Sequence, residues 1–429
     1  MNIIIAILIF SLVVIVHEMG HFLLAKANHI MVTEFSVGMG PTLFSTVRNE
    51  TKYSLKLLPF GGSCMMLGEN GEEDGEASFN SKSVWARMSV ILAGPIFNLL
   101  LAFFISIVII SLVGADPSRI TSVKEGSPAA EAGLQEGDLI TRYEGSSISL
   151  GRELYTEVSL DGIPSDEISL TYKRDGKKQD ITYVPYAAEK YMLGYTYYPD
   201  VEGKAEVATL MPGYPFAKAG LQVGDIILEV DGTVINSNKE LEQYFNAHPL
   251  DGTAVKITYQ HGERIHDTEV TPKLSKNAEL GFGFNMAREK QSPLGVLKYS
   301  VREIGYWVKT TIKSLGMLIT GKFTVNDLSG PVGVVNEIGK TIETSKADGG
   351  FYVLLNLLNF TILLSANLGV MNLVPFPALD GGRMVFLIIE AIRGKAIKQE
   401  VEGMVNFAGL MLLMALMVFV MFNDIRKIF

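Results

Sequence analysis

Three long stretches of this sequence contain no charged side chain, and they are residues 88–115, 349–379 and 403–423. Each has at least the roughly 20 residues that an α-helix needs to cross a bilayer. A fourth apolar run covers residues 1–25. It lacks the basic start and the small-residue cleavage site of a signal peptide, so we interpret it as a retained first span. The predicted fold class is therefore membrane α-helical, with four transmembrane helices.

Charge is distributed unevenly between the segments that join these spans. The loops at residues 26–87 and 380–402 carry lysine and arginine close to the spans, whereas residues 116–275 hold 15 basic and 26 acidic side chains. Because cytoplasmic loops are enriched in Lys and Arg, we expect both basic loops in the cytoplasm. The acidic block and both termini are then expected on the outer side, and no nucleic-acid partner is expected.

The acidic block contains an internal repeat, in which residues 127–145 match residues 214–232 at an offset of 87 positions. Each copy has the pattern of a short helix, a glycine turn, a strand and a hairpin turn. The shared pattern Ala-Gly-Leu-x-x-Gly-Asp-x-Ile resembles tandem PDZ domains. That resemblance implies two α+β PDZ-like domains, at residues 116–200 and 201–290.

In such domains the segments LGYTYY (193–198) and LGFGFN (280–285) would be the peptide-binding strands. They are expected to come last in each domain, as in circularly permuted bacterial PDZ domains. Residues 193–198 would then belong to the first domain and residues 280–285 to the second.

Two further segments are expected beside the spans. Residues 33–67 alternate with a period of two and are punctuated by glycines, which predicts a membrane-associated β-hairpin within the loop at residues 26–87. Residues 291–348 begin with apolar side chains at helical spacing and basic ones between them. This pattern predicts an amphipathic helix on the membrane surface, followed by a connecting segment.

The first span ends in the motif HEMGH, which places His17, Glu18 and His21 within five residues. On a helix the two histidines project from one face and can hold one metal ion, with Glu18 beside its open side. Neutral imidazole suits Zn²⁺, which lowers the pKa of a bound water towards 7. Glu18 would then act as the general base. Alternatively, the three side chains only pack or cap within the bundle, although ionisable groups inside a span are usually functional.

A catalytic zinc site needs a third protein ligand. His29 follows the first span, and His248, His261 and His266 lie in the second repeat, on the opposite side. The remaining candidate is Asp380, which is the first charged residue after the third span. Its alternative role is to cap the helix that follows it.

Three features together resemble the site-2 protease family. They are HExxH in the first span, the pattern Asn-x-x-Pro-x-x-x-x-Asp-Gly at residues 372–381, and the PDZ-like repeat between them. The segments GPIFN (94–98) and LSGPVGV (328–334) also match the family. The two-repeat layout is similar to that of the bacterial regulator-of-sigma-E proteases.

The resemblance implies that His17, His21 and Asp380 bind zinc and that Glu18 is the catalytic base. It also implies a group of residues that hold the substrate, present its backbone or support the site, and these are Asn367, Asn372, Pro375, Gly38, Gly40, Gly61 and Gly62.

These features predict an intramembrane zinc endopeptidase of the bacterial cytoplasmic membrane that cuts single-span membrane proteins near the cytoplasmic face. The resemblance implies substrates of the anti-sigma-factor type, already trimmed outside, and remnant signal peptides. The PDZ-like pair would gate or bind the outer region of the substrate, and membrane lipid would surround the spans. The alternatives are a non-proteolytic PDZ scaffold or chaperone, which has no use for HEMGH, and a transporter, which needs ionisable groups through all its spans.

Overall fold

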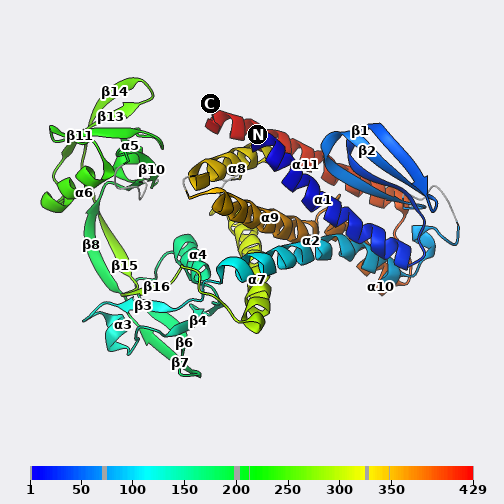
Figure 1. The fold of residues 1–429 in the computed structure, drawn as a ribbon, viewed down its shortest axis with the longest axis horizontal. Helices are drawn as coiled ribbons and strands as arrows, with labels where there is room; N and C mark the ends of the chain where they lie inside the picture. Colours follow the sequence, from blue (N-terminus) through cyan, green and yellow to red (C-terminus); the bar gives the residue numbers. More distant parts are fainter. Residues whose placement is uncertain are drawn as a thin grey trace. The chain divides into compact units, whose positions relative to one another are not determined.

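The structure of the protein is a computed structural model, and Figure 1 shows its fold. The chain divides into two compact units. The helical unit comprises residues 1–116 and 287–429, and the repeat unit comprises residues 117–286. The residues that the structure describes are 2–69, 75–197, 203–211, 213–323, 328–346 and 348–428.

Four helices of the helical unit, within the described residues, are long and apolar enough to cross a membrane. They are α1 (Asn2–Ala27), α2 (Val84–Val113), α9 (Gly350–Asn372) and α11 (Gln399–Ile428). The prediction of four apolar helices is confirmed. The third apolar stretch continues to residue 379, but α9 stops at Asn372 because Pro375 and Pro377 cannot continue a helix.

Small residues allow the apolar helices to pack closely. A Cβ on Gly20 of α1 would lie 2.7 Å from the carbonyl carbon of Ala93 in α2, so this approach requires glycine. On its other side α2 packs against α9, and Ala102 and Ala366 are fully buried in their shared cluster. Close packing of α1, α2 and α9 fixes the side chains between them.

Two further helices cover the bundle. α7 contributes Ile304 and Trp307 to the cluster between α2 and α9. α8 buries Ile338 and Ile342 against the first turns of α1. The segment after the amphipathic helix was expected to be only a connection, but it contains the second of these helices. Their bounds are Pro293–Ile319 for α7 and Pro331–Lys346 for α8.

A β-hairpin joins α1 to α2 and lies beside α1 in Figure 1. Its strands are β1 (Val32–Arg48) and β2 (Thr51–Met66), which pair antiparallel. Asn49 and Glu50 form the turn, both with positive φ, as a two-residue turn between twisted strands requires. The part of the hairpin near the turn exposes apolar side chains, including Phe44 at 67%.

The repeat unit contains two similar sets of elements, and each set forms a four-stranded antiparallel sheet. The sheet orders are β5-β4-β6-β7 and β12-β11-β13-β14. The first set is β3 (Ile120–Val123), α3 (Pro128–Glu131), β4 (Leu139–Tyr143), β5 (Ser146–Ser147), α4 (Gly151–Asp161), β6 (Ile168–Arg174) and β7 (Lys177–Tyr183). The second set is β10 (Val207–Leu210), α5 (Pro215–Lys218), β11 (Ile226–Val230), β12 (Thr233–Val234), α6 (Asn238–Ala247), β13 (Val255–His261) and β14 (Arg264–Val270).

The two sets exchange their last strands, contrary to the division expected at residue 200. β9 (Tyr195–Tyr197) pairs with β10 of the second set, and β16 (Phe282–Phe284) pairs with β3 of the first. The expected strand at residues 193–198 therefore lies in the second repeat, although Tyr198 is outside the described residues. The strand at residues 280–285 lies in the first.

A pair of long strands makes this exchange possible. β8 (Tyr186–Met192) and β15 (Lys273–Glu279) pair antiparallel, so the chain crosses to the second repeat along one strand and returns along the other. Buried side chains follow the exchange, since Leu193 packs in the core of the second repeat and Phe282 in that of the first. The second repeat is thus inserted within the first.

Candidate metal centre

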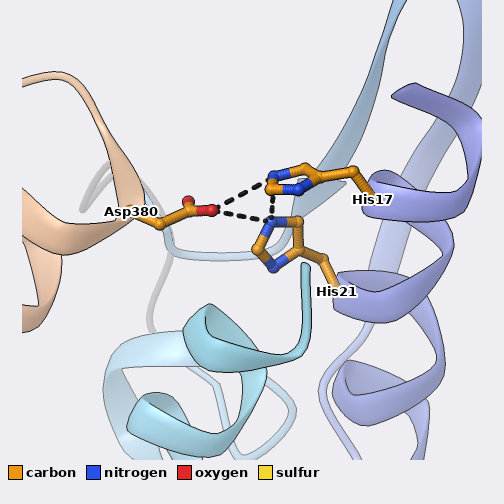
Figure 2. A group of neighbouring side chains, drawn as sticks. All are labelled: His17, His21 and Asp380. Atoms are coloured by element: carbon orange, nitrogen blue, oxygen red, sulfur yellow. Dashed lines mark hydrogen bonds and ion pairs between the residues drawn. The ribbon is translucent and has the colours of Figure 1, made fainter. Parts of the chain in front are cut away.

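Two histidines of α1 lie one helical turn apart and bring their rings together (Figure 2). The Nε2 atoms of His17 and His21 are 3.1 Å apart. Both side chains are buried. A separation of four residues places two side chains on one face of a helix, which is the arrangement that the HEMGH motif predicts.

Asp380 brings a carboxylate to the same point from a distant part of the chain (Figure 2). It is the first residue of α10 (Asp380–Arg393). Its Oδ2 lies 3.1 Å from Nε2 of His17 and 3.4 Å from Nε2 of His21. This oxygen is buried and accepts no hydrogen bond within the described part of the chain. The N-cap position of α10 is Leu379, so Asp380 does not cap the helix, and its carboxylate faces the histidines.

The three atoms have the spacing of ligands around one small cation. Tetrahedral zinc has bonds of about 2.0–2.1 Å to nitrogen and oxygen, which places neighbouring ligand atoms about 3.3 Å apart. The observed separations between the three atoms, 3.1, 3.1 and 3.4 Å, match that distance. Two imidazoles and one carboxylate are also a donor set that zinc accepts. The residues present therefore fit a zinc ion.

Helix α2 contacts the Nδ1 atoms of both histidines, on the side of each ring away from Asp380. Nδ1 of His21 lies 2.8 Å from the backbone oxygen of Val90, and since a carbonyl only accepts, this ring nitrogen is the donor. Nδ1 of His17 lies 3.2 Å from the side-chain amide of Asn98. Partners of this kind fix the orientation of ligand imidazoles.

A glycine of α2 makes room for the two rings. A Cβ on Gly94 would lie 2.6 Å from Cε1 of His21 and 2.8 Å from Cε1 of His17. Sequence reasoning assigned no role to Val90, Gly94 or Asn98. The one available signal was the segment GPIFN, which contains the last two of these residues.

Glu18 is half-buried and lies beside the hairpin. Its Cγ is 3.2 Å from the position that a Cβ would take on Gly62 of β2. The carboxylate is not part of the group formed by His17, His21 and Asp380. Glu18 therefore lies next to the group of His17, His21 and Asp380 without belonging to it.

The sequence pattern of peptidase family M50 matches residues 5–416. The chain belongs to peptidase family M50. This finding confirms the resemblance to the site-2 proteases that the motifs suggested. It also makes the protein a zinc metalloprotease, as expected, with zinc as its cofactor.

Curated relatives match the M50 chain along almost its whole length. Zinc metalloprotease RasP of Geobacillus kaustophilus is 32% identical over 446 residues, which cover 99% of this chain and 97% of the relative. The regulator of sigma E protease of Haemophilus influenzae is 30% identical over 456 residues, with 97% of each chain covered. The regulator of sigma-W protease RasP of Bacillus subtilis is 30% identical, with 99% and 98% covered.

The four glycines expected to present substrate all lie in the hairpin of the M50 chain. Gly38, Gly40 and Gly61 have φ near +85°, a conformation that favours glycine. A Cβ on Gly38 would lie 3.1 Å from the backbone oxygen of Lys56, so it also allows a close approach of the two strands. Among the four, Gly62 is the one beside Glu18.

Asn367, Asn372 and Pro375 lie on the segment that leads to Asp380, the first two in α9 and the third in the turn that follows it. Asn367 of α9 accepts a hydrogen bond from Thr311 of α7, so its observed contact joins two helices. Asn372 is the last residue of α9, and Pro375 lies in the turn that leads to Asp380. That these three residues hold the substrate or support the site stays a prediction.

Two ion pairs hold the helix that carries Asp380. Arg383 of α10 pairs with Glu69, which follows the end of β2. Glu390 of α10 accepts from Arg87 of α2, with Nη1 and Oε2 3.1 Å apart. Arg87 is buried, with an exposed fraction of 7%. Loss of Glu390 would leave the charge of Arg87 buried without a counter-charge, which is strongly destabilising. The two pairs link α10 to α2 and to the segment that follows β2.

Proposed function

We propose that this protein is an intramembrane zinc endopeptidase that cleaves single-span membrane proteins. The observation that carries the proposal is the meeting of His17, His21 and Asp380 at a helix apolar enough to cross a membrane. Ionisable groups are costly in hydrocarbon, so their presence within such a helix indicates a function there. A protease that acts on soluble chains has no reason to bear that cost.

The side chains of the site divide the chemistry between them. His17, His21 and Asp380 would hold zinc, which when bound supplies an activated water and polarises the scissile carbonyl. Glu18 takes a proton from the attacking water. It then passes that proton to the nitrogen of the leaving amine, so that the cleaved peptide bond yields a carboxylic acid and an amine, and the acid's remaining proton ends on the amine to give a carboxylate and an ammonium group.

The hairpin supplies a way to present the substrate. A transmembrane helix hides its carbonyls in its own hydrogen bonds, and an unwound segment leaves backbone groups unpaired in lipid. Adding the segment as a strand to an existing hairpin satisfies those groups. Gly62 lies beside Glu18 without a side chain to obstruct the approach. We assign substrate alignment to this part of β2, with Gly38, Gly40 and Gly61 shaping the hairpin around it.

The orientation follows from charge. The basic loops at residues 26–87 and 380–402 would face the cytoplasm and residues 116–275 the outer side. In a bacterium this places the site near the cytoplasmic face of the cytoplasmic membrane. The repeats, which we interpret as PDZ-like, would then gate or bind the outer part of the substrate. Relatives named as regulators of sigma factors favour substrates of the anti-sigma-factor type.

Cleavage by the Glu18→Gln variant tests this function. The purified protein is reconstituted in liposomes with a single-span substrate whose outer domain is a short stub. The variant should bind one zinc ion per chain but cleave at least about 100-fold more slowly than wild type, because Glu18 is a base and not a ligand. Glu337→Gln, which changes an exposed glutamate of α8, is the matched control and should cleave normally. Near-wild-type cleavage by Glu18→Gln would contradict the mechanism, and a wild type that binds zinc without cleaving would favour the scaffold.

A further inference from the structure

A zinc ligand histidine needs a partner on its second nitrogen. When Nε2 binds the metal, the neutral ring carries its proton on Nδ1, and that nitrogen becomes a donor. Ligand histidines in metal sites almost always donate this proton to a carboxylate, a carbonyl or a water. Both His17 and His21 are buried, so each requires such an acceptor within the protein.

His21 has its acceptor in the backbone. Nδ1 of His21 is 2.8 Å from the carbonyl oxygen of Val90, which can only accept. The proton therefore lies on Nδ1, and Nε2 keeps a free lone pair towards Asp380. The backbone of α2 therefore suffices to fix the orientation of the His21 ring.

The group next to Nδ1 of His17 is a side chain two helical turns further along α2. Asn98 is fully buried, and one end of its amide lies 3.2 Å from Nδ1 of His17. The other end, Oδ1, is buried without a hydrogen-bond partner among the described residues. A buried amide oxygen without a partner costs about 1–3 kcal/mol, so it calls for an explanation.

The two ends of an amide exchange places by a half-turn of the terminal torsion, with almost no change in shape. With Nδ2 towards the ring, two donors would face each other once Nδ1 carries the proton. With Oδ1 towards the ring, Nδ1–H donates to the oxygen that otherwise has no partner. Either orientation leaves one end of the amide unpaired, so the ring proton decides between them.

We propose that Asn98 is a positioning residue whose Oδ1 accepts the Nδ1 proton of His17 and so directs Nε2 at the metal. This inference rests on the proposed zinc ligation by His17. Helix α9 packs against this part of α2, where Ser365 donates to the backbone oxygen of Asn98 at 2.8 Å, a bond that does not involve the side-chain amide. Gly369 lets α9 approach the Cβ of Asn98. Helix α2 would thus orient both histidines, through a backbone carbonyl for His21 and a side-chain carbonyl for His17.

Two variants at position 98 test the proposal. Their zinc affinity is measured by chelator competition on the full-length protein in detergent. Asn98→Asp keeps the shape of the side chain and offers acceptors only, so it should bind zinc at least as tightly as wild type. Asn98→Leu has no acceptor and should bind zinc 10- to 100-fold more weakly. Ser365→Ala is the packing control, because it removes the bond to Asn98 without touching the ring. Its zinc affinity should equal that of wild type.

The cobalt-substituted proteins give a second readout that does not depend on activity. The visible absorption of Co²⁺ in the Asn98→Asp variant should match that of wild type, and in Asn98→Leu it should change in position or intensity. Weak zinc binding by Asn98→Asp would show that the amide acts as a donor and would overturn the proposal. So would a Ser365→Ala variant that loses as much affinity as Asn98→Leu, because the effect would then be one of packing.

The outcomes also separate this inference from the proposed function. If the wild type binds no zinc, the metal centre itself is wrong and both ideas fail together. If the wild type binds zinc and cleaves its substrate while Asn98→Leu keeps full affinity, only the role of Asn98 is wrong. Asn98→Asp is nearly isosteric with the native residue, so the test stands even if the leucine variant does not fold.

Discussion

Oδ2 of Asp380 lies 3.1 Å from Nε2 of His17, although 363 positions of sequence separate the two residues. The carboxylate is presented by α10 and the imidazole by α1, and the loop from residue 373 to residue 379 turns the chain so that they meet. Ala378 adopts a positive φ in this turn, and its backbone N–H donates to Asn406 of α11. The candidate metal centre therefore depends on the route of the chain between two helices as much as on the three side chains that form it.

Asp380→Ala should abolish high-affinity zinc binding and cleavage, because it removes one of the three proposed ligands. The measurement is the zinc content of the purified protein after dialysis. Asp424→Ala is the matched control, since Asp424 is another buried aspartate and caps α8 by accepting from Gly333 at 2.8 Å. Loss of a cap costs about 1 kcal/mol of stability and should leave the metal in place. Unchanged zinc affinity in Asp380→Ala would rule out the ligand role.

Gly94→Ala should reduce zinc affinity strongly, since the added methyl group would occupy the space of both imidazoles. Under the same chelator competition, Gly305→Ala in α7 should bind zinc as wild type does, because a Cβ there meets no atom within 4 Å. Alanine also has the higher helix propensity, so the control should not lose stability. Equal zinc affinity in the two variants would mean that α2 moves away from α1 without cost.

Arg174→Met should destabilise the first repeat by about 1.5–3 kcal/mol, the range for a hydrogen bond to a charged group. The guanidinium donates to both oxygens of Asp138, which is 1% exposed. Because of these bonds the pKa of Arg174 is raised, so the pair persists at any physiological pH. Lys276→Met is the control, because its partner Glu189 is exposed and such pairs contribute little. Urea unfolding followed by tyrosine fluorescence compares the two, and equal midpoints would contradict the prediction.

Removal of the repeat unit distinguishes a gate from a recruitment site. Ala115 and Glu289 form a β-bridge, with N–H···O distances of 3.0 and 2.6 Å, so the unit leaves and rejoins the helical unit at one place. A short Gly/Ser linker can therefore replace residues 117–286. If the repeats act as a steric gate, the shortened protein should cut substrates with intact outer domains and still cut trimmed ones.

The same pair of liposome assays exposes the opposite case. Loss of cleavage of trimmed substrate, while untrimmed substrate stays resistant, would show that the repeats recruit the substrate and do not exclude it. A linker of equal length inserted after residue 286 in the intact chain controls for the added flexibility. It should leave both substrates as they are in the wild type.

The sequence was sufficient to predict the four apolar helices, the hairpin and the meeting of His17, His21 and Asp380. These features depend on local composition, or on chemistry that leaves few alternatives for a third ligand. Val90, Gly94 and Asn98 were not predicted, because their roles depend on how α2 is rotated and how closely it packs against α1. Nothing in a single apolar stretch reports that rotation.

The exchange of β9 and β16 was also beyond reach of the pattern. Residues 193–198 and 280–285 are related by the same offset of 87 as the rest of the repeat, so either assignment fits the alignment. The pairing of β8 with β15 decides between the two assignments. These strands begin 87 residues apart in the chain, so no local pattern reveals their pairing.

The inserted second repeat sets an order of events during synthesis. Val123 of β3 pairs with Phe282 of β16, so the first repeat cannot complete its structure until the chain has grown past residue 284. By then every strand of the second repeat has already been made. The repeat that begins later along the chain can therefore finish first, which reverses the usual N-terminal-first order. A chain that stops before residue 282 would leave β3 as an open edge, and such edges invite pairing with other chains.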